Sequence, residues 1–210
     1  MSKEQELEFI TNLLNQNNIN YWLDSGTLLG LYREGKILDH DKDIDISIWN
    51  SEEYTIVQIS KYLLDNYTLR VLNYYGYNFK YKFTPKDKTR LLTIDFNLFI
   101  QKKDYALCPQ PIIRRNIISS IIWRFYNKKY EKLQKVIFDT PFFKLLFKMY
   151  TWKVPAKYFI DTIKKGNFVY PIETENYLEL RYGNWRFPQN NWSFVNDDKG
   201  LSKLDINNFQ

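Results

Sequence analysis

The segment 40-HDKDIDISI-48 combines a strand pattern with a pair of carboxylates. Its second half alternates apolar and polar side chains and is rich in isoleucine, which predicts a strand with one buried face. Residues two apart on a strand point to the same side, so Asp43 and Asp45 face together while the isoleucines point into a core. Two carboxylates about 4 Å apart repel by about 4 kcal/mol at an effective dielectric near 20, and a divalent cation between them removes that cost. A solvated edge strand is the alternative explanation for Asp-Ile-Asp taken alone.

A third carboxylate follows the same strand pattern further along the chain. Asp95 lies in the segment 93-TIDFN-97, where apolar and polar residues again alternate. Three carboxylates on adjacent strands form an oxygen site suited to Mg²⁺ or Mn²⁺. The chain has one Cys and one His, so oxygen atoms are the ligands available to such a metal. We therefore expect Asp43, Asp45 and Asp95 to be metal ligands.

A turn of small residues precedes this strand, in the segment 24-DSGTLLG-30. A glycine followed by a small hydroxyl residue, between a strand and a helix, presents backbone N–H groups that cradle phosphate. Gly26 and Thr27 are therefore candidate phosphate-binding residues, and Ser25 is the expected N-cap of the helical turn. A capped turn without phosphate binding is the alternative. The combination of this turn, Asp-x-Asp and a third Asp is more specific than any part alone.

The rest of the chain mixes helices and strands. We expect helices at 4–17, about 51–64 and 174–182, and strands at 19–23, 68–72, 77–83 and 91–100. From Ile112 to about Tyr150 the pattern is mostly helical, with a break at Pro141. The expected fold class is α+β, with a mixed β-sheet and flanking helices over residues 1–108 and a helical C-terminal lobe over residues 109–210, in one compact unit.

Length and composition exclude several classes of protein. The chain has 210 residues, of which 44% are hydrophobic and 26% charged, as in globular proteins and unlike disordered or fibrous chains. No apolar run is long enough for a membrane-spanning helix, and the polar, acidic start lacks the layout of a signal peptide. A single Cys excludes an internal disulfide and a cysteine-rich zinc site. These features predict a cytoplasmic protein.

The positive charge is concentrated in one segment. The formal net charge is +6, and residues 112–153 carry ten Lys and Arg against two acids. Such a segment fits phosphates, nucleic acid or an anionic membrane surface, the last implying a peripheral position at the inner face of the membrane. The alternatives are a solvated helix face for the charges and a helical core for the Ile and Phe residues among them. In a third reading, Arg114, Arg115 and Arg124 face the active site.

Two longer motifs are 26-GTLLGLYREGKILDHDKDIDI-46 and 177-YLELRYGNWRFP-188. Together they resemble the LicD/fukutin family of the DNA polymerase β-like nucleotidyltransferase superfamily. The resemblance covers about residues 5–192 and implies a nucleotidyltransferase-like sheet. It also implies the transfer of a phospho-alcohol, such as choline, ribitol or glycerol phosphate, from a CDP-linked donor to a sugar hydroxyl. The implied acceptor is a cell-surface glycan of lipopolysaccharide, teichoic acid or capsule type, in one reading lipid-linked.

The resemblance assigns roles to single residues. Asp43 and Asp45 would bind Mg²⁺ or Mn²⁺, and Asp41 would complete the shell or bind a metal-bound water. Asp95 would be a shared ligand or the general base for the acceptor hydroxyl, a role worth about 10²–10⁴-fold. The substrate-binding candidates are Gly26 and Thr27 for the diphosphate, Arg33 and Lys36 for the transferred phosphate, Asp41, and Tyr182 for a substrate wall. A surface ion pair for Arg33 and a helix cap for Tyr182 are the structural alternatives.

The sequence departs from the family pattern at a few positions. Asp39-His40 replaces the usual Pro-Trp, Lys42 stands where many members have Asp, and Lys36 stands where many have Gly. These changes keep all four aspartates, so they bear on the identity of donor and acceptor more than on the chemistry.

Three other functions compete with this one. A nucleotidyltransferase acting on a protein or small molecule would share the turn and Asp-x-Asp. A glycosyltransferase with Asp-x-Asp would need neither the turn nor Asp95. A nucleic-acid-binding module is not expected, because a trio of carboxylates without a metal repels phosphate.

Overall fold

The computed structural model describes residues 1–87, 92–114, 116–131, 133–189 and 191–209, and the side chains from 127 to 131 lie outside this description. The helices are α1 (Lys3–Gln16), α2 (Ser25–Glu34), α3 (Glu53–Leu63), α4 (Ile117–Glu131), α5 (Pro141–Leu146) and α6 (Thr174–Tyr182). The strands are β1 (Tyr21–Leu23), β2 (Asp43–Trp49), β3 (Tyr67–Tyr74), β4 (Tyr77–Pro85), β5 (Thr93–Lys102), β6 (Tyr105–Ile113), β7 (Lys135–Ile137), β8 (Phe147–Pro155), β9 (Thr162–Lys165), β10 (Phe168–Pro171) and β11 (Leu201–Lys203). Short 3₁₀ turns occupy Asn50–Glu52, Ala156–Tyr158 and Ile206–Asn208.

Local capping explains where α1 and α2 begin. Ser2 and Gln5 form a capping box, in which each side chain accepts a hydrogen bond from the other residue's backbone N–H. Asp24 caps α2, because its carboxylate accepts a hydrogen bond from the N–H of Ser25. The expected N-cap, Ser25, is therefore wrong by one residue. The helix ends at Gly35, whose φ of +71° suits glycine.

Nine of the described strands form one curled sheet, with β5 at its centre. β2 lies parallel to β5 on one side, and β4 lies antiparallel to it on the other. The second half of β5 pairs with β6, and the sheet continues through β8 to β11. The β9–β10 hairpin forms a separate small sheet. The mixed sheet with its flanking helices confirms the α+β class.

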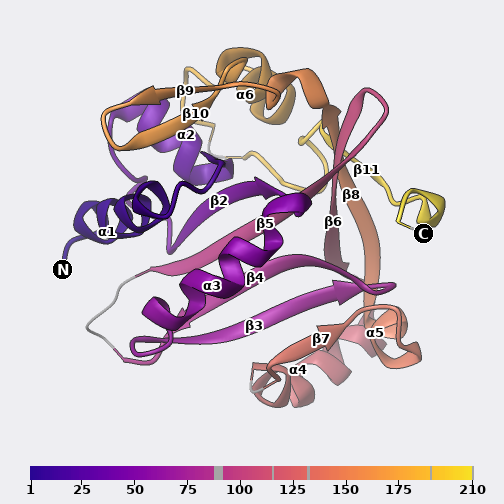
Figure 1. Cartoon of the computed structure of the whole chain (residues 1–210). Helices are drawn as coiled ribbons and strands as arrows, with labels where there is room; N and C mark the ends of the chain where they lie inside the picture. The colour runs from indigo at the N-terminus through magenta and orange to yellow at the C-terminus, as the bar shows by residue number, and fades with distance from the viewer. Residues whose placement is uncertain (88–91, 115, 132, 190, 210) are drawn as a thin grey trace.

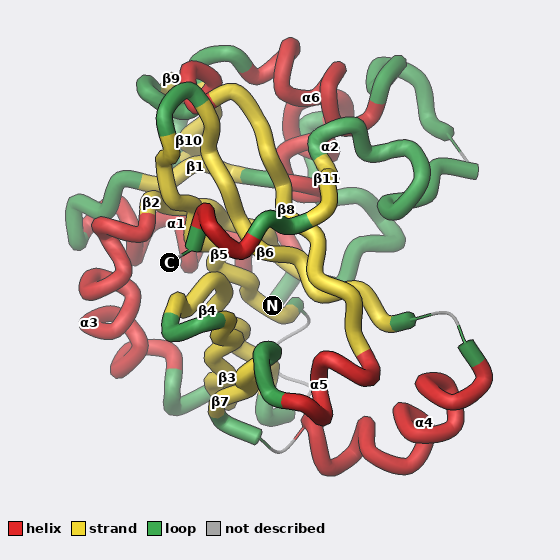
Figure 2. The backbone as a smooth tube through the Cα atoms, turned by 90° about the vertical axis from the view of Figure 1, so that its right-hand side faces the viewer, coloured by secondary structure: helices red, strands yellow, loops and turns green. Residues whose placement is uncertain are grey.

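The helices cover the sheet unevenly. In Figure 1, α3 lies across one face of the sheet, whereas α1 and α2 lie beside β2 at one end. Figure 2 shows α4 on the side of the molecule away from α3, next to α5. One face of the central strands therefore packs against helices, while the face away from α3 remains available for a site.

The core follows the alternation along β2 and β5. Ile44, Ile46, Ile94 and Phe96 are fully buried, while the aspartates between them point to the other face. A second, smaller apolar cluster lies under α4 and α5, with Phe79, Val136, Phe138, Phe143 and Leu146 among its buried members. Hydrophobic burial therefore fixes the direction in which the carboxylates point.

The second half of the chain differs from the expected helical lobe. β6 pairs with β8 over nine residues, from Tyr105 opposite Pro155 to Ile113 opposite Phe147, so this half extends the sheet. Pro141 begins α5 at a position that favours proline, rather than breaking a longer helix. The expectation of helix from Ile112 to Tyr150 is correct for α4 and α5 and wrong for β7 and β8. Strand partners some forty residues apart leave no local periodicity, which explains the error.

Within the described ranges, every helix is too short or too polar to cross a bilayer.

Candidate active site

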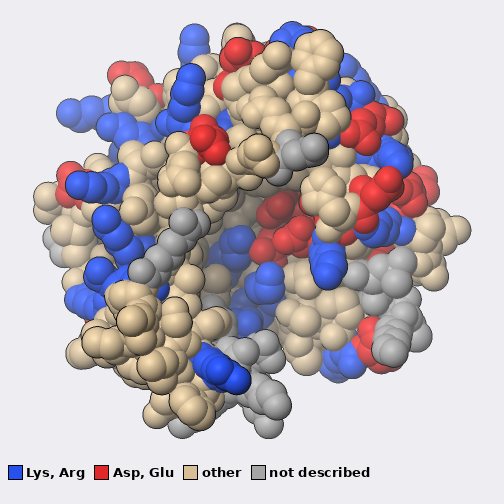
Figure 3. Space-filling model, turned by 180° about the vertical axis from the view of Figure 1, so that it is seen from behind, with Lys and Arg blue, Asp and Glu red and all other residues tan. Residues whose placement is uncertain are grey.

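A cavity of about 670 Å³ opens on the side of the sheet away from α3. Its wall combines α2, the loop after it, β2, β4, β5, β6, β8, α6 and the loop that follows α6. Figure 3 shows a hollow in this face where acidic and basic side chains meet. A concave site of this size with converging polar groups is the usual form of a small-molecule site.

Asp43 and Asp45 line this cavity from β2, as the alternation predicts. The parallel register places Asp45 opposite Asp95 on β5, so the three carboxylates share one face. Burial raises the pKa of Asp43, and the charge of Asp95 raises it further. Burial raises the pKa of Asp45 more strongly, with Lys80 opposing and Asp43 and Asp95 adding to the shift. The surroundings of the pair therefore disfavour its negative charge.

Asp95 lies in a different electrostatic setting. The Lys80 ammonium lies 2.9 Å from one carboxylate oxygen of Asp95, and that of Lys82 lies 3.2 Å from the other. Burial acts to raise the pKa of Asp95, but the two lysines outweigh it and hold the pKa below its usual range. Sequence reasoning missed both lysines, although their alternation with Phe79, Tyr81 and Phe83 along β4 could have placed them on this face.

Gly26 lies in close contact with a carboxylate. A Cβ at this position would lie 2.5 Å from Oδ2 of Asp41, so only glycine fits here without a shift. That Oδ2 atom is buried and has no hydrogen-bond partner among the described residues. Ser25 also lines the cavity with an unpartnered buried hydroxyl, and its φ of +49° is rare for a residue with a side chain. Strained backbone and unpaired polar atoms in one place are typical of a binding site.

Thr27 has a contact other than the expected one. Its side chain is buried, and its hydroxyl oxygen accepts a hydrogen bond of 2.9 Å from the N–H of Asp45. Thr27 is absent from the cavity wall that the described residues form. It therefore fixes the backbone of a cavity carboxylate instead of presenting its hydroxyl to phosphate.

The two basic residues expected to bind phosphate, Arg33 and Lys36, lie in different surroundings. Arg33 lines the cavity, where its guanidinium donates to the carbonyl of Trp185 at 3.2 Å and pairs with Glu34 at 2.6 Å. Lys36 is exposed, pairs with Asp39 at 2.8 Å, and is absent from the described cavity wall. Only Arg33 is therefore placed to meet a ligand.

Tyr182 lines the cavity as part of an aromatic wall. Its ring centroid lies 4.8 Å from that of Trp192, and Trp185 and Phe187 line the same region. The indole N–H groups of Trp185 and Trp192 are buried and have no acceptor among the described residues. This wall combines flat apolar faces with two free donors.

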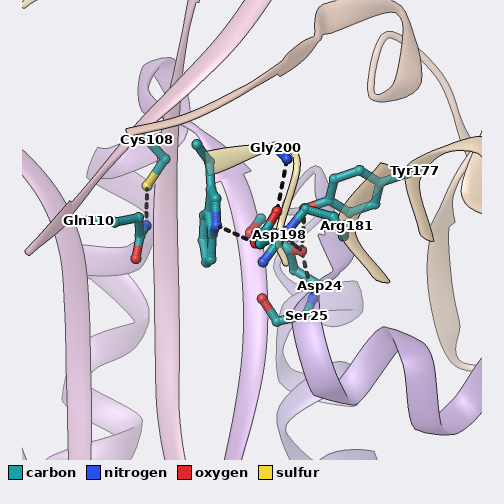
Figure 4. Close-up of polar contacts among 10 residues, drawn as sticks. Asp24, Ser25, Cys108, Gln110, Tyr177, Arg181, Asp198 and Gly200 are labelled. Atoms are coloured by element: carbon teal, nitrogen blue, oxygen red, sulfur yellow. Dashed lines mark hydrogen bonds and ion pairs between the residues drawn. The ribbon is translucent and has the colours of Figure 1, made fainter. Parts of the chain in front are cut away.

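A buried polar network at the cavity wall joins α6 to the turn that precedes the first motif (Figure 4). Oδ1 of Asp24 accepts hydrogen bonds from the Ser25 N–H and the Tyr177 hydroxyl, both at 2.6 Å, and Oδ2 accepts one from Ser47. The guanidinium of Arg181 donates to the Tyr177 hydroxyl at 2.6 Å. Tyr177 therefore connects α6 to the first residue of the turn before α2.

Arg181 also has partners other than Tyr177, namely Asp198 and Trp152. Its Nε donates to Oδ2 of Asp198 at 2.6 Å, and its guanidinium carbon lies 4.1 Å from the Trp152 ring centroid. The Trp152 indole N–H and the Gly200 N–H also donate to Asp198. The spacing of Tyr177 and Arg181, four residues apart on α6, indicates a shared helix face. Asp198 lies after both motifs, and no local signal in the sequence points to it.

Asp43 and Asp45 offer oxygen ligands to a hard cation, but the third expected ligand, Asp95, is already paired with lysines. Within the described ranges, no three His, Cys, Asp or Glu side chains converge closely enough to hold a metal. Asp43, Asp45 and Asp95 therefore do not form a complete set of metal ligands by themselves. Both oxygens of Asp95 bind lysine ammonium groups instead. Mg²⁺ is commonly held by one or two carboxylates together with waters and substrate phosphates, which Asp43 and Asp45 can provide. The unpartnered Oδ2 of Asp41, beside Gly26, is further acceptor capacity at the same place.

Comparison with known proteins identifies a family. A family model described as LicD/FKTN/FKRP, nucleotidyltransferase domain, matches residues 18–157, more than half of the chain. An uncharacterized protein of Rickettsia prowazekii (strain Madrid E) is 49% identical over 47 residues, which is 22% of this chain and 18% of that protein. An uncharacterized protein of Rickettsia typhi (strain ATCC VR-144 / Wilmington) is 49% identical over 47 residues, 22% of this chain and 15% of that protein. These matches cover less than a fifth of either relative.

Proposed function

The chain belongs to the LicD/FKTN/FKRP nucleotidyltransferase-domain family, and from this premise we propose a specific transfer reaction. A CDP-linked donor gives up its phospho-alcohol, of choline, ribitol or glycerol type, to a sugar hydroxyl of a cell-surface glycan. The observation that carries the proposal is the cavity in which Asp43 and Asp45, on one face of β2, lie in the same wall as the Gly26 turn.

The carboxylates of β2 are the proposed metal ligands. Asp43 and Asp45 would hold Mg²⁺ or Mn²⁺, with the donor diphosphate supplying further oxygens. The bound ion would neutralise the diphosphate and stabilise the attacking and leaving oxygens. Thr27 supports this role by fixing the backbone N–H of Asp45. Gly26 supports it by leaving space for Asp41.

The basic residues of the cavity receive the rest of the donor's charge. Lys80 lines the cavity and is held there by Asp95, while Arg33 faces it from α2. We propose that both meet phosphate oxygens as charge builds up on the departing nucleotide. Lys36 is dropped from this set, because it is exposed and pairs with Asp39.

The proposed step forms one P–O bond and breaks another. The acceptor hydroxyl oxygen attacks the phosphorus that carries the alcohol, and the bond to the second phosphate breaks with its electron pair leaving on CMP. The hydroxyl proton passes to a carboxylate of the cavity or to water. Asp95 is poorly suited to receive it, because both of its oxygens bind ammonium groups and its pKa is lowered. We therefore assign to Asp95 the positioning of Lys80.

A second candidate function follows from the description of the matched family. A nucleotidyltransferase domain is also consistent with transfer of a nucleotide itself, from a nucleoside triphosphate to a protein or small molecule. An Asp-x-Asp glycosyltransferase is less consistent, because the Gly26 turn and the Lys80–Asp95 pair would have no role in it.

The released product separates these reactions. Purified protein is incubated with Mg²⁺ and, in turn, CDP-choline, CDP-ribitol, CDP-glycerol, UDP-sugars, CTP and ATP, with a glycan acceptor. Release of CMP from a CDP-alcohol, with phosphate appearing on the glycan in the phosphorus NMR spectrum, is the expected result. Release of pyrophosphate from a triphosphate, or of UDP from a UDP-sugar, would contradict the proposal and support one of the other two reactions.

A further inference from the structure

The outer face of α4 is apolar and exposed. Ile117 is 78% exposed, Ile118 63%, Ile121 52% and Phe125 77%. These four side chains, here called the α4 strip, were expected from the sequence to be either part of a helical core or a contact surface. Their exposure excludes the core. An exposed apolar strip of this kind marks an interaction site.

The opposite face of α4 holds the helix in place. Ser119 is buried, and its hydroxyl donates to the carbonyl of Leu145 at 3.4 Å. Ile122 and Trp123 pack on the smaller apolar cluster, where the Trp123 ring makes an edge contact with Phe147 at 5.4 Å. The strip is therefore presented by a helix that is anchored through its other side.

The segment that carries the strip also carries exposed cations. Arg124 on α4, Arg114 before it, and Lys144 and Lys148 after it are all exposed. Asp139 is the acid whose side chain is described in this segment, and its carboxylate already accepts a hydrogen bond from the Tyr75 N–H. Arg115 and Lys132 lie outside the described residues, as do the side chains of Lys128, Lys129 and Glu131. The described charges of this segment are thus predominantly positive.

We propose that the α4 strip docks the protein on an anionic lipid surface. Apolar side chains enter the headgroup boundary while neighbouring lysines and arginines meet the lipid charges. Charge complementarity favours this partner, since a second copy of the chain would bring the same cations together. Donor phosphates are not the target, because Arg114 and Arg124 are absent from the described cavity wall.

The position of α4 gives the docking a consequence for the site. α4 lies on the side of the molecule away from α3, and the hollow with its acidic floor opens on that side as well (Figures 2 and 3). A protein docked through α4 would therefore have its cavity on the same side of the molecule as the docking helix, where a lipid-linked glycan could be met. This last step rests on the proposed function, whereas the docking itself does not.

Vesicle flotation tests the proposal. The full chain is mixed with vesicles of phosphatidylcholine alone or with a share of phosphatidylglycerol, at low and at physiological salt. We expect binding to the anionic vesicles that weakens as salt rises, because surface charges are screened within about 8 Å at physiological ionic strength. No binding to anionic vesicles at low salt would overturn the proposal.

Two variants and a control locate the contact. Ile121→Ser combined with Phe125→Ser should weaken vesicle binding about tenfold or more, and Arg124→Glu should weaken it through charge alone. The control is Val57→Ser on α3, which removes an exposed apolar side chain from the other side of the molecule. All these side chains are exposed, so unchanged melting temperatures are expected and confirm folding. Equal loss of binding in the control would refute the assignment to α4.

Two further measurements test whether a second copy of the chain is the partner, and whether docking and the proposed transfer can fail independently. Analytical ultracentrifugation of the wild type should show no self-association, and a dimer that the strip variants dissociate would identify a second copy as the partner instead. Transfer of phospho-alcohol to a water-soluble acceptor should be the same in the strip variants and the wild type. Vesicle binding without any transfer would therefore support docking and refute the proposed function. Transfer without vesicle binding would refute docking alone.

Discussion

Two clusters of charged side chains lie close together in this protein. In the complete cluster, around Arg181, the charged groups have partners within the protein, whereas in the incomplete cluster, on the cavity floor, some of them lack such partners. Around Arg181, the carboxylates of Asp24 and Asp198 accept hydrogen bonds from several donors, and the guanidinium itself stacks on Trp152. On the cavity floor, burial raises the pKa of Asp45 and the like charges of Asp43 and Asp95 add to the shift, and the Oδ2 atom of Asp41 has no partner in the described chain.

The difference indicates what each cluster is for. Buried polar groups that are fully paired rigidify a structure, and a cluster of this kind needs nothing from outside. The cavity wall gathers four carboxylates, and the two lysines nearest to them, Lys80 and Lys82, both bind Asp95. A cation and a phosphate-bearing ligand would complete it. We therefore interpret the first cluster as structural and propose the second as a binding site.

The largest expected effect tests the incomplete cluster. Asp45→Asn should reduce transfer by about 10³-fold or more, or about 4 kcal/mol of transition-state stabilisation, because it removes a proposed metal ligand. In the presence of EDTA the melting temperature should hold or rise, since one source of repulsion is gone.

Asp39→Asn is the matched control, because Asp39 is an exposed carboxylate in the preceding loop that pairs with Lys36. It should leave transfer unchanged. Wild-type turnover of Asp45→Asn at saturating Mg²⁺ would remove Asp45 from the mechanism.

The next effect tests the complete cluster. Arg181→Met leaves Asp24 and Asp198 buried without their cation, which should cost about 3–5 kcal/mol of stability. At roughly 2–4 °C per kcal/mol for a chain of this size, the melting temperature should fall by about 6–20 °C. Arg186→Met, at an exposed arginine five residues later that pairs with Glu175, should leave the melting temperature unchanged. Equal stability of both variants would show that the network is not structural.

A smaller effect is expected at Asp95, the cavity carboxylate that binds Lys80 and Lys82. Asp95→Asn should lower stability by about 1.5–3 kcal/mol, because the buried Lys80 loses a charged hydrogen-bond partner. Transfer should fall while affinity for the CDP-linked donor, measured by calorimetry, is retained. Loss of donor binding together with activity would make Asp95 a binding ligand, and full activity with unchanged stability would contradict any role at the site.

The smallest effect concerns the contact that supports Asp45. Thr27→Val keeps the shape of the side chain and removes the acceptor for the Asp45 N–H, at a cost of about 1–3 kcal/mol. We expect a lowered melting temperature and reduced transfer, both restored by Thr27→Ser. A variant as stable and active as the wild type would show that Asp45 needs no such support.

Local patterns in the sequence were sufficient for the carboxylate face. Alternation of apolar and polar residues placed Asp43, Asp45 and Asp95 on one side of the sheet, because burial of the isoleucines leaves them no other direction. The helix expected at 174–182 is α6 as the structure has it. These features depend on residues within a few positions of one another.

What the sequence could not predict depends on distant partners. The pairing of β6 with β8 and the contact of Arg181 with Asp24 join residues far apart in the chain. The ion pairs of Lys80 and Lys82 changed the interpretation of Asp95, because a carboxylate that binds two ammonium groups is neither a free base nor a free ligand. The exposure of the α4 strip likewise depends on which face of α4 packs against the rest of the protein.

Anomalous diffraction from crystals soaked in Mn²⁺ and CDP tests the central claim most directly. The account predicts an anomalous peak at about 2.0–2.2 Å from oxygens of Asp43 and Asp45, with the diphosphate completing the shell. It also predicts that the peak is absent from crystals of Asp45→Asn prepared in the same way. A Mn²⁺ ion bound elsewhere, or at the same place in the variant, would contradict the assignment of these two carboxylates as the metal site.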